Sequence, residues 1–166
     1  MRNLLVVLLL VLPMGLCKAQ SPAAKPVEPT AIGIVYRLDP SSQELKKLPD
    51  EQWVEKNGNM DPRKIFEEVK GGQSVFRIKT GEIIEFVFKT GSPEKVSLFR
   101  FEVKKNKRQF QTMMLNRMGG GQLIKGIAVE VSKLGESSYK LIPASPLTPG
   151  EYTIVIADNL YTFGVD

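Results

Sequence analysis

The sequence predicts an all-β fold, an antiparallel β-sandwich or a partly open barrel of about 8–10 short strands with one short helix. Three observations predict it. Short runs alternate apolar and polar residues, turn signals rich in Gly and Pro separate these runs, and only one segment has helical spacing. Because successive side chains of a strand point to opposite faces, an alternating run can bury one face and expose the other.

The first strands are predicted from "GIVYRLD" and "QELKKL", joined by a turn at residues 39–42. Further strands are expected within 82–89, 97–103, 126–132 and 151–157. In the first of these four, one face carries Ile84, Phe86 and Phe88.

The one helix is predicted in "MDPRKIFEEVKGG", residues 60–72. Asp61 is a candidate N-cap, and Pro62 suits the first helical position because its missing N–H is not needed there. An apolar stripe follows at Ile65, Phe66 and Val69, and two glycines supply a stop. We expect this helix to cover one end or edge of the sheet.

The last residues, "SPLTPGEYTIVIADNLYTFGVD", predict a closing hairpin. Tyr152 and Phe163 lie on alternating apolar runs, and the expected turn is Asp158-Asn159. Aromatic and β-branched cross-strand pairs contribute about 0.2–1 kcal/mol each, so this pattern favours a structural role over a binding role. We expect Tyr152 and Phe163 to be largely buried, with the Tyr152 hydroxyl bonded to nearby backbone.

The early tyrosine-bearing hairpin and the ending "L-x-PGEY…FGVD" resemble a loose group of uncharacterised exported bacterial all-β proteins. The resemblance spans most of the chain after residue 30, but it rests on turn and core residues. It therefore implies an exported β domain and transfers no catalytic residue.

The N-terminus has the pattern of a secretory signal peptide over residues 1–19. Arg2 precedes the apolar run Leu4–Leu12, and Cys17-Lys18-Ala19 offers a cleavage site before Gln20. Nine apolar residues fall short of the about 20 that span a bilayer, which disfavours a membrane anchor. A lipoprotein acylated at Cys17 is a further alternative, disfavoured by the bulky Leu16. A Pro-rich linker is predicted at 20–30 and a single β domain at 31–166.

The cysteine content and the net charge indicate in which compartment the protein resides and which partners it has. Cys17 is the only cysteine, and the chain has no N-x-S/T sequon, so both observations favour a bacterial periplasm or cell surface. The net charge is +5, and it becomes +3 if Arg2 and Lys18 are removed. This mildly basic balance does not indicate a nucleic-acid partner.

The residue types exclude several chemistries. The chain contains no histidine, which excludes Ser-His-Asp and Cys-His nucleophilic sites and the usual zinc sites. No calcium-loop motif is present. The glycine-rich run 117–122 lacks the phosphate-loop order and is predicted to be a loop between strands.

Paired carboxylates that could hydrolyse glycosides are not apparent. Glu82 and Glu85 are three residues apart and would face opposite sides of a strand, whereas Glu67 and Glu68 would diverge on the predicted helix. The acidic stretch Asp50-Glu51, with Glu55 nearby, is expected to be a solvated loop.

The sharpest charge feature is "KKNKR". We expect an exposed basic hairpin tip, with Asn106 in the turn and Phe110 and Met113-Met114 in the core beyond it. The tip could contact anionic lipid, glycolipid or acidic glycan, although a solvated turn without a ligand is the simpler interpretation. The candidate contact residues are Lys104, Lys105, Lys107 and Arg108.

These patterns lead to a functional expectation. We expect a non-catalytic exported β domain, periplasmic or at the cell surface, that acts as a binding or envelope-associated accessory module without a cofactor. Its partner would be anionic envelope lipid or glycan, or another envelope protein. The alternative is a structural subunit of a surface assembly that uses exposed sheet edges, and a carboxylate-dependent hydrolase comes third.

Overall fold

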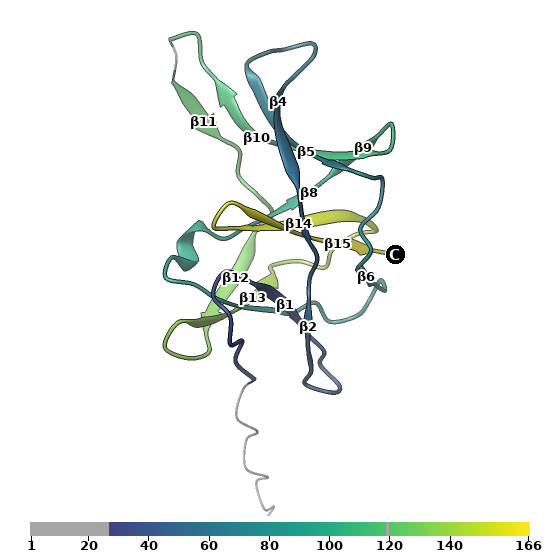
Figure 1. Ribbon diagram of the computed structural model, residues 1–166, viewed down its shortest axis with the longest axis vertical. Coiled ribbons are helices and arrows are strands. Elements are labelled where there is room, and N and C mark those ends of the chain that lie inside the picture. The colour runs from purple at the N-terminus through teal and green to yellow at the C-terminus, as the bar shows by residue number, and fades with distance from the viewer. Residues whose placement is uncertain (1–26, 119) are drawn as a thin grey trace, which may run out of the picture.

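The computed structural model describes residues 27–118 and 120–166, and it confirms the all-β class. Within these residues, fifteen short strands form three five-stranded sheets, and the one helical element is a 3-10 turn, η1, at Pro93–Lys95. The sheets follow one another along the long axis of the molecule (Figure 1). From the bottom of that view to the top, we call them the base, central and arm sheets.

The base sheet confirms the predicted first hairpin. Its strands β1 (Val35–Leu38) and β2 (Leu45–Lys47) are antiparallel, with Tyr36 opposite Lys47. Along the sheet the strands are β12 (Val129–Lys133), β13 (Ser138–Pro143), β7 (Phe86–Lys89), β1 and β2. The predicted one-sided burial of residues 82–89 is wrong in one respect, because Val87 is buried together with Phe86 and Phe88.

The central sheet is built on the C-terminal hairpin. Its strands run in the order β3 (Asp50–Glu51), β15 (Asn159–Val165), β14 (Gly150–Ile156) and β8 (Ser97–Arg100), and β6 (Arg77–Ile78) joins β15 as a parallel neighbour.

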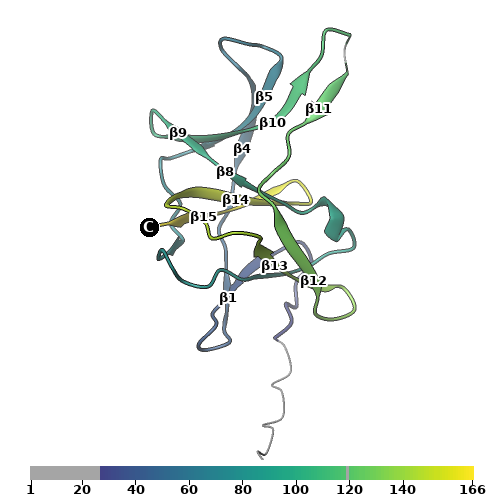
Figure 2. The ribbon, with the colours of Figure 1, turned by 180° about the vertical axis from the view of Figure 1, so that it is seen from behind.

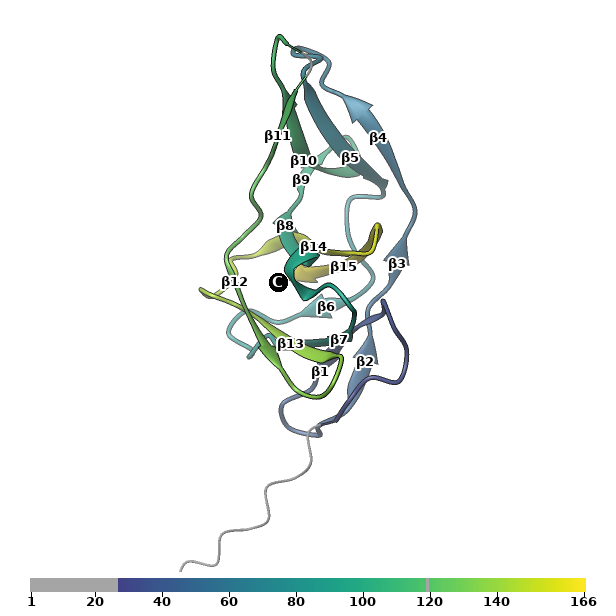
Figure 3. The same ribbon diagram turned by 90° about the vertical axis from the view of Figure 1, so that its left-hand side faces the viewer.

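The arm sheet extends away from the other two (Figures 1 and 3). Its strands run in the order β11 (Gly121–Leu123), β10 (Lys107–Leu115), β5 (Lys64–Lys70) and β4 (Trp53–Asn57), and β9 (Glu102–Lys104) also pairs with β10. The sheet therefore carries two long hairpin-like pairs, β4–β5 and β10–β11.

The main core lies between the base and central sheets, as in a β-sandwich. Phe86 of the base sheet lies 4.9 Å, between ring centroids, from Phe163 of the central sheet. As predicted, Tyr152 and Phe163 are buried, and the Tyr152 hydroxyl donates to the Thr148 carbonyl at 2.6 Å. The closing hairpin is therefore a structural element.

A second core lies between the central and arm sheets. It contains Val69 and Phe110 of the arm, Phe101, and Leu160 of β15, with Trp53 packed against them. The central sheet thus buries both of its faces, which explains why nearly every residue of β14 and β15 is inaccessible.

The turn of the closing hairpin lies one residue earlier than predicted. Ile156 pairs with Asn159, so the two-residue loop is Ala157-Asp158. Both residues have positive φ, 48° and 64°. Such left-handed pairs match the twist of a two-residue hairpin, whereas Asn159 already belongs to β15.

The predicted helix at 60–72 is wrong, because this segment forms strand β5. Ile65 and Val69 are four residues apart, and this spacing places two side chains on one face of a helix and also on one face of a strand. In β5 the buried face carries Ile65 and Val69. The nine-residue strand β10 pairs with β5 along the whole length of β5.

The strand count exceeds the predicted 8–10 because single runs cross from sheet to sheet. The run 97–103 enters the central sheet as β8 and continues in the arm as β9, with only Phe101 between them. Similarly, β2, β3 and β4 follow one another through all three sheets along one side of the molecule (Figure 3).

The predicted signal peptide 1–19, Cys17 and most of the linker lie outside the described residues. The last linker residues, 27–30, are not a free tether, because Pro29 is buried and Glu28 accepts a hydrogen bond of 3.0 Å from the Ser138 hydroxyl. In the described part of the chain, no helix is long and apolar enough to cross a membrane.

Candidate lysine groove on the arm sheet

The outward face of the arm sheet carries a shallow groove of about 420 Å³. Strand alternation selects its residues: Lys64, Phe66 and Glu68 of β5 face the groove, whereas Ile65 and Val69 face the core. Five lysines and three carboxylates line it, together with apolar and amide side chains: Lys56, Lys64, Lys104, Lys105, Lys107, Asp61, Glu68, Glu102, Met60, Phe66 and Gln109.

The predicted basic hairpin tip forms one rim of this groove. Lys104 pairs with Lys107, so the turn consists of only Lys105 and Asn106, with φ of 50° and 57°. Asn106 is in the turn, as expected, and its side-chain oxygen accepts a 3.0 Å hydrogen bond from the Gly72 N–H. This contact attaches the tip to the loop that follows β5.

Two of the three carboxylates of the groove, Glu68 and Asp61, are already neutralised from within the protein. Glu68 accepts bonds from Lys56 at 2.6 Å and Lys107 at 2.9 Å, and these bonds lower the pKa of Glu68 and raise that of Lys107. Asp61 pairs with Arg63 at 2.9 Å, which lowers the pKa of Asp61.

Three cations of the groove are left over. Within residues 27–118 and 120–166, Lys64, Lys104 and Lys105 have no carboxylate at ion-pair distance. Glu102 accepts a hydrogen bond from the Gln109 amide instead. The groove therefore presents uncompensated positive charge beside an exposed apolar side chain, Val54 of β4.

Arg108 does not belong to the exposed tip, contrary to the sequence prediction. Because the turn has only two residues, Lys107 and Arg108 are already in β10 and point to opposite faces. Arg108 is 1% exposed, and its guanidinium lies 5.4 Å from the centroid of the Phe101 ring. Lys104, Lys105 and Lys107 are exposed as predicted.

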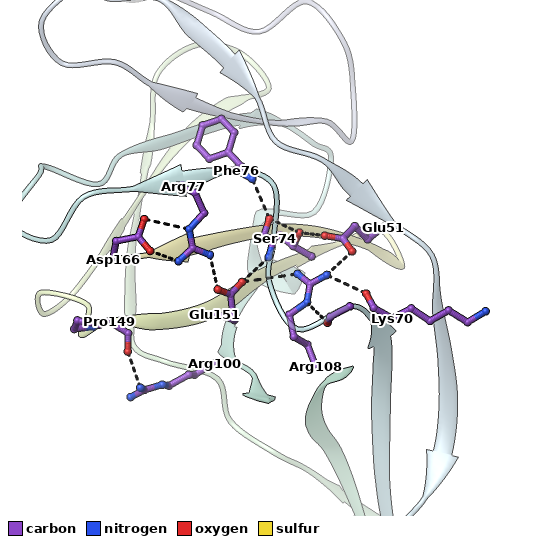
Figure 4. Close-up of polar contacts among 12 residues, drawn as sticks. Glu51, Lys70, Ser74, Phe76, Arg77, Arg100, Arg108, Pro149, Glu151 and Asp166 are labelled. Carbon is purple, nitrogen blue, oxygen red and sulfur yellow. Dashed lines mark hydrogen bonds and ion pairs between the residues drawn. The ribbon is translucent and has the colours of Figure 1, made fainter. Parts of the chain in front are cut away.

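The buried guanidinium of Arg108 belongs to a polar cluster between the arm and central sheets (Figure 4). It donates to Glu51 at 2.5 Å and to the Gly71 carbonyl at 3.0 Å, and Glu151 lies 3.9 Å away. The sequence predicted that Glu51 lies in a solvated loop, and this prediction is wrong. It lies in β3, where it also accepts a hydrogen bond from the Thr162 hydroxyl.

A second arginine extends the cluster. Arg77 bonds to both Glu151 and Asp166, and these bonds raise the pKa of Arg77 and lower that of Asp166. The Ser74 N–H donates to Glu151 at 2.7 Å. Each carboxylate is therefore bonded to an arginine, so the cluster serves to join the sheets.

Glu67, on the inner side of the arm sheet, has a raised pKa. Burial, then the nearby charges of Glu55 and Asp158, raise the pKa of Glu67 to about 7. Glu55 lies directly opposite Glu67 across β4 and β5. Glu67 can hold a proton near neutrality, but its orientation toward the core side separates it from the groove lined by Glu68.

The other two carboxylates considered in the sequence analysis, Glu82 and Glu85, are both paired with basic side chains. Glu82 pairs with the largely buried Arg37, and Glu85 pairs with Lys140 at 3.5 Å. Among the described residues, no group of three or more Cys, Asp or Glu side chains is arranged to hold a metal ion. Of the glycine-rich run 117–122, residues 117, 118 and 120 lie between β10 and β11 as predicted, whereas Gly121 and Gln122 already belong to β11.

A second concavity, of about 350 Å³, lies on the base side of the molecule. It is mainly apolar and lies between the residues before β7, such as Ile83, and the end of β13 with the residues after it, such as Ile142 and Leu147. Its walls carry one carboxylate, Glu82, which is bonded to Arg37.

No protein-family model matches the chain, and searches of the curated proteins and of the solved structures found no significant match. The resemblance suggested by the closing hairpin stays a prediction.

Proposed function

We propose that this protein is a non-catalytic, exported β module that binds an anionic envelope partner through the lysine groove of the arm sheet. The observation that supports this most is the charge distribution in the groove. Glu68 and Asp61 are neutralised by Lys56, Lys107 and Arg63, whereas Lys64, Lys104 and Lys105 project free cations. Uncompensated lysines on one face attract phosphate, sulfate or carboxylate groups and steer their approach.

A binding role accounts for the carboxylates better than a catalytic one. A general acid or base has to reach a substrate with a suitable pKa. Glu51, Glu82 and Glu151 are bonded to arginines. Glu67, which has a pKa near 7, lies on the other side of the arm sheet from the groove.

Export is the second part of the proposal, and it rests on the sequence of residues 1–19. A cleaved signal peptide would deliver the module to the periplasm or the cell surface. Anionic lipid headgroups and acidic glycans are the polyanions available there, which fits the charge of the groove.

An assembly subunit is the second candidate, and strand β12 favours it. In the described part of the chain β12 pairs only with β13, so its other edge is open, and four of its five residues are exposed. An open edge can accept a strand from another chain. The mass in solution separates the candidates, since an assembly subunit forms oligomers at micromolar concentration and the binding module stays monomeric.

The binding proposal is tested by removing the positive charge of the hairpin tip, which consists of the free Lys104 and Lys105 and of Lys107, paired with Glu68. The variant Lys104→Ser, Lys105→Ser, Lys107→Ser should lose at least about tenfold in retention on anionic vesicles and on a sulfated polysaccharide matrix at low salt, where exposed charges are screened least. Its thermal midpoint should remain nearly unchanged. Arg108 is kept, because its role is in the core.

The matched control removes three exposed lysines elsewhere, with the substitutions Lys79→Ser, Lys95→Ser and Lys133→Ser. This control has the same net charge as the tip variant but should retain most of the binding. Equal losses in both variants would show that net charge alone drives retention, and no retention of the unmodified protein at low salt would overturn the proposal.

A further inference from the structure

Two turns lie together at the end of the molecule opposite the start of the described chain. They join β4 to β5 and β10 to β11, and all three ribbon views place them at the far end of the arm (Figures 1, 2 and 3). Each turn carries one methionine that is completely exposed, Met60 at 101% and Met118 at 97%. Long, fully exposed apolar side chains therefore mark the tips of both hairpins.

Both turns are held in shape by their own hydrogen bonds. In the first, the Gly58 N–H bonds to the Lys64 carbonyl at 2.8 Å, and Asp61 accepts from the Arg63 N–H at 3.2 Å and side chain at 2.9 Å. In the second, the Asn116 side-chain oxygen accepts from the N–H groups of Met118 and Gly120, both at 2.9 Å. These bonds restrain the described backbone beside each methionine, which reduces the entropic cost of inserting the side chain into another environment.

Among the described residues, each methionine has an unpaired cation near it in the sequence. Lys64 follows Met60 by four residues, whereas Arg63 is paired with Asp61, and Arg117 directly precedes Met118. Met60 also lines the lysine groove, so this methionine and the free charges of the groove belong to one continuous surface.

A bilayer with anionic headgroups fits this combination. Its surface attracts lysine and arginine, and the acyl layer below it accepts apolar side chains. The affinity for the bilayer therefore combines electrostatic attraction with the burial of apolar surface. An acidic glycan supplies the charge but no apolar layer, and it would leave the methionines in water. Methionine is suited to such insertion because its thioether is flexible and polarizable.

We infer that the anionic partner is a lipid bilayer, and that Met60 and Met118 are the two insertion points by which the arm sheet enters it. This rests on the proposed function, since the lysine groove supplies the attraction. The arm would then stand on the membrane with the base sheet farthest from it.

The variant Met60→Ser, Met118→Ser tests the inference. Each methylene removed from an apolar environment weakens partition by about fourfold, so losing both tips should weaken binding to phosphatidylglycerol-containing vesicles at least about tenfold. Retention on a sulfated polysaccharide should not change, because that matrix has no apolar layer. The matched control, Ile32→Ser with Val75→Ser, removes two exposed apolar side chains from the loops before β1 and β6, and it should bind vesicles like the unmodified protein.

The outcomes separate the inference from the proposed function. If the unmodified protein binds neither vesicles nor the polysaccharide, the proposed function fails. If it binds both and the methionine variant binds vesicles equally well, only the insertion points are refuted, and an acidic glycan becomes the better partner.

A second readout needs no substitution. Hydrogen peroxide transfers an oxygen atom to an exposed thioether, giving methionine sulfoxide and water. Anionic vesicles should slow the oxidation of Met60 and Met118 severalfold, as followed by peptide mass spectrometry, whereas the polysaccharide should not. Equal oxidation rates with and without vesicles, under conditions in which the protein is bound, would overturn the inference.

Discussion

The buried arginine of the arm offers a test of how the sheets are joined. In the variant Arg108→Met the side-chain volume is nearly kept, but the hydrogen bonds to Glu51 at 2.5 Å and to the carbonyls of Gly71 at 3.0 Å and Lys70 at 3.3 Å are lost. Breaking a buried ion pair from one side costs about 3–5 kcal/mol, because the remaining charge stays buried without its partner.

The loss should fall at the lower end of that range. Glu151 keeps its bonds to Arg77 and to the Ser74 N–H, and Glu51 keeps the Thr162 hydroxyl. We therefore expect Arg108→Met to lower the free energy of unfolding by about 3 kcal/mol, as measured by urea denaturation with an unchanged slope.

Two controls make this result specific. Lys107→Met alters the neighbouring residue on the exposed face and should change the free energy of unfolding by less than about 1 kcal/mol, as for a surface ion pair. Glu51→Gln alone and with Arg108→Met completes a double-mutant cycle, and contacting residues couple by about 0.5–3 kcal/mol. Equal effects of Arg108→Met and Lys107→Met would refute the role of Arg108 in joining the sheets.

Three further predictions concern the closing hairpin, the inner carboxylate and the N-terminus. Phe163→Ala should lower the free energy of unfolding by about 3–5 kcal/mol, because Phe163 is buried between the sheets, and an unchanged denaturation midpoint would contradict this. Because the pKa of Glu67 is raised from 4.5 to about 7, the folded protein binds more protons than the unfolded chain between these values, and stability falls as the pH rises through this window. Glu67→Gln should thus be more stable than the unmodified protein by roughly 1–2 kcal/mol at pH 8, a value that allows for the partial exposure of Glu67. At pH 4 the two proteins should be equally stable. The same difference in stability at both pH values would argue against a titrating Glu67. N-terminal sequencing of the exported protein should begin at Gln20; an intact Met1 would contradict cleavage, and an acylated Cys17 would indicate a lipoprotein.

The sequence was informative where local pattern determines structure. Tyr152 and Phe163 were predicted to be buried because they lie in two apolar runs, joined by a turn, whose aromatic and β-branched residues stabilise cross-strand pairs. The two-residue turn Ala157-Asp158 was misplaced because an alanine with positive φ gives no sequence signal. The helix at 60–72 was predicted wrongly because the spacing of Ile65 and Val69 fits both a helix and a strand, and pairing with β10, about 40 residues later, decides between them.

The site was predictable in part. Lys104, Lys105 and Lys107 follow from a charge run at a turn. Arg108 required knowledge of the turn length, and Glu51, its partner, is 57 residues away in sequence. Alternation on β5 would have placed Lys64 and Glu68 on one face if the strand had been recognised. The exposed methionines had a signal that was not used, since "NGNMDP" and "NRMGGG" place each one among turn-forming residues.

The most direct test of the binding surface is hydrogen–deuterium exchange of the protein with and without phosphatidylglycerol-containing vesicles at low salt. We expect slower amide exchange in residues 56–61 and 102–107, the two segments that supply most of the lining of the lysine groove, and no change in β12 and β13 of the base sheet. Raising the salt should remove this protection, because it screens the lysines. Protection confined to the base sheet, or none on the arm while the protein is bound, would contradict the lysine groove as the contact surface.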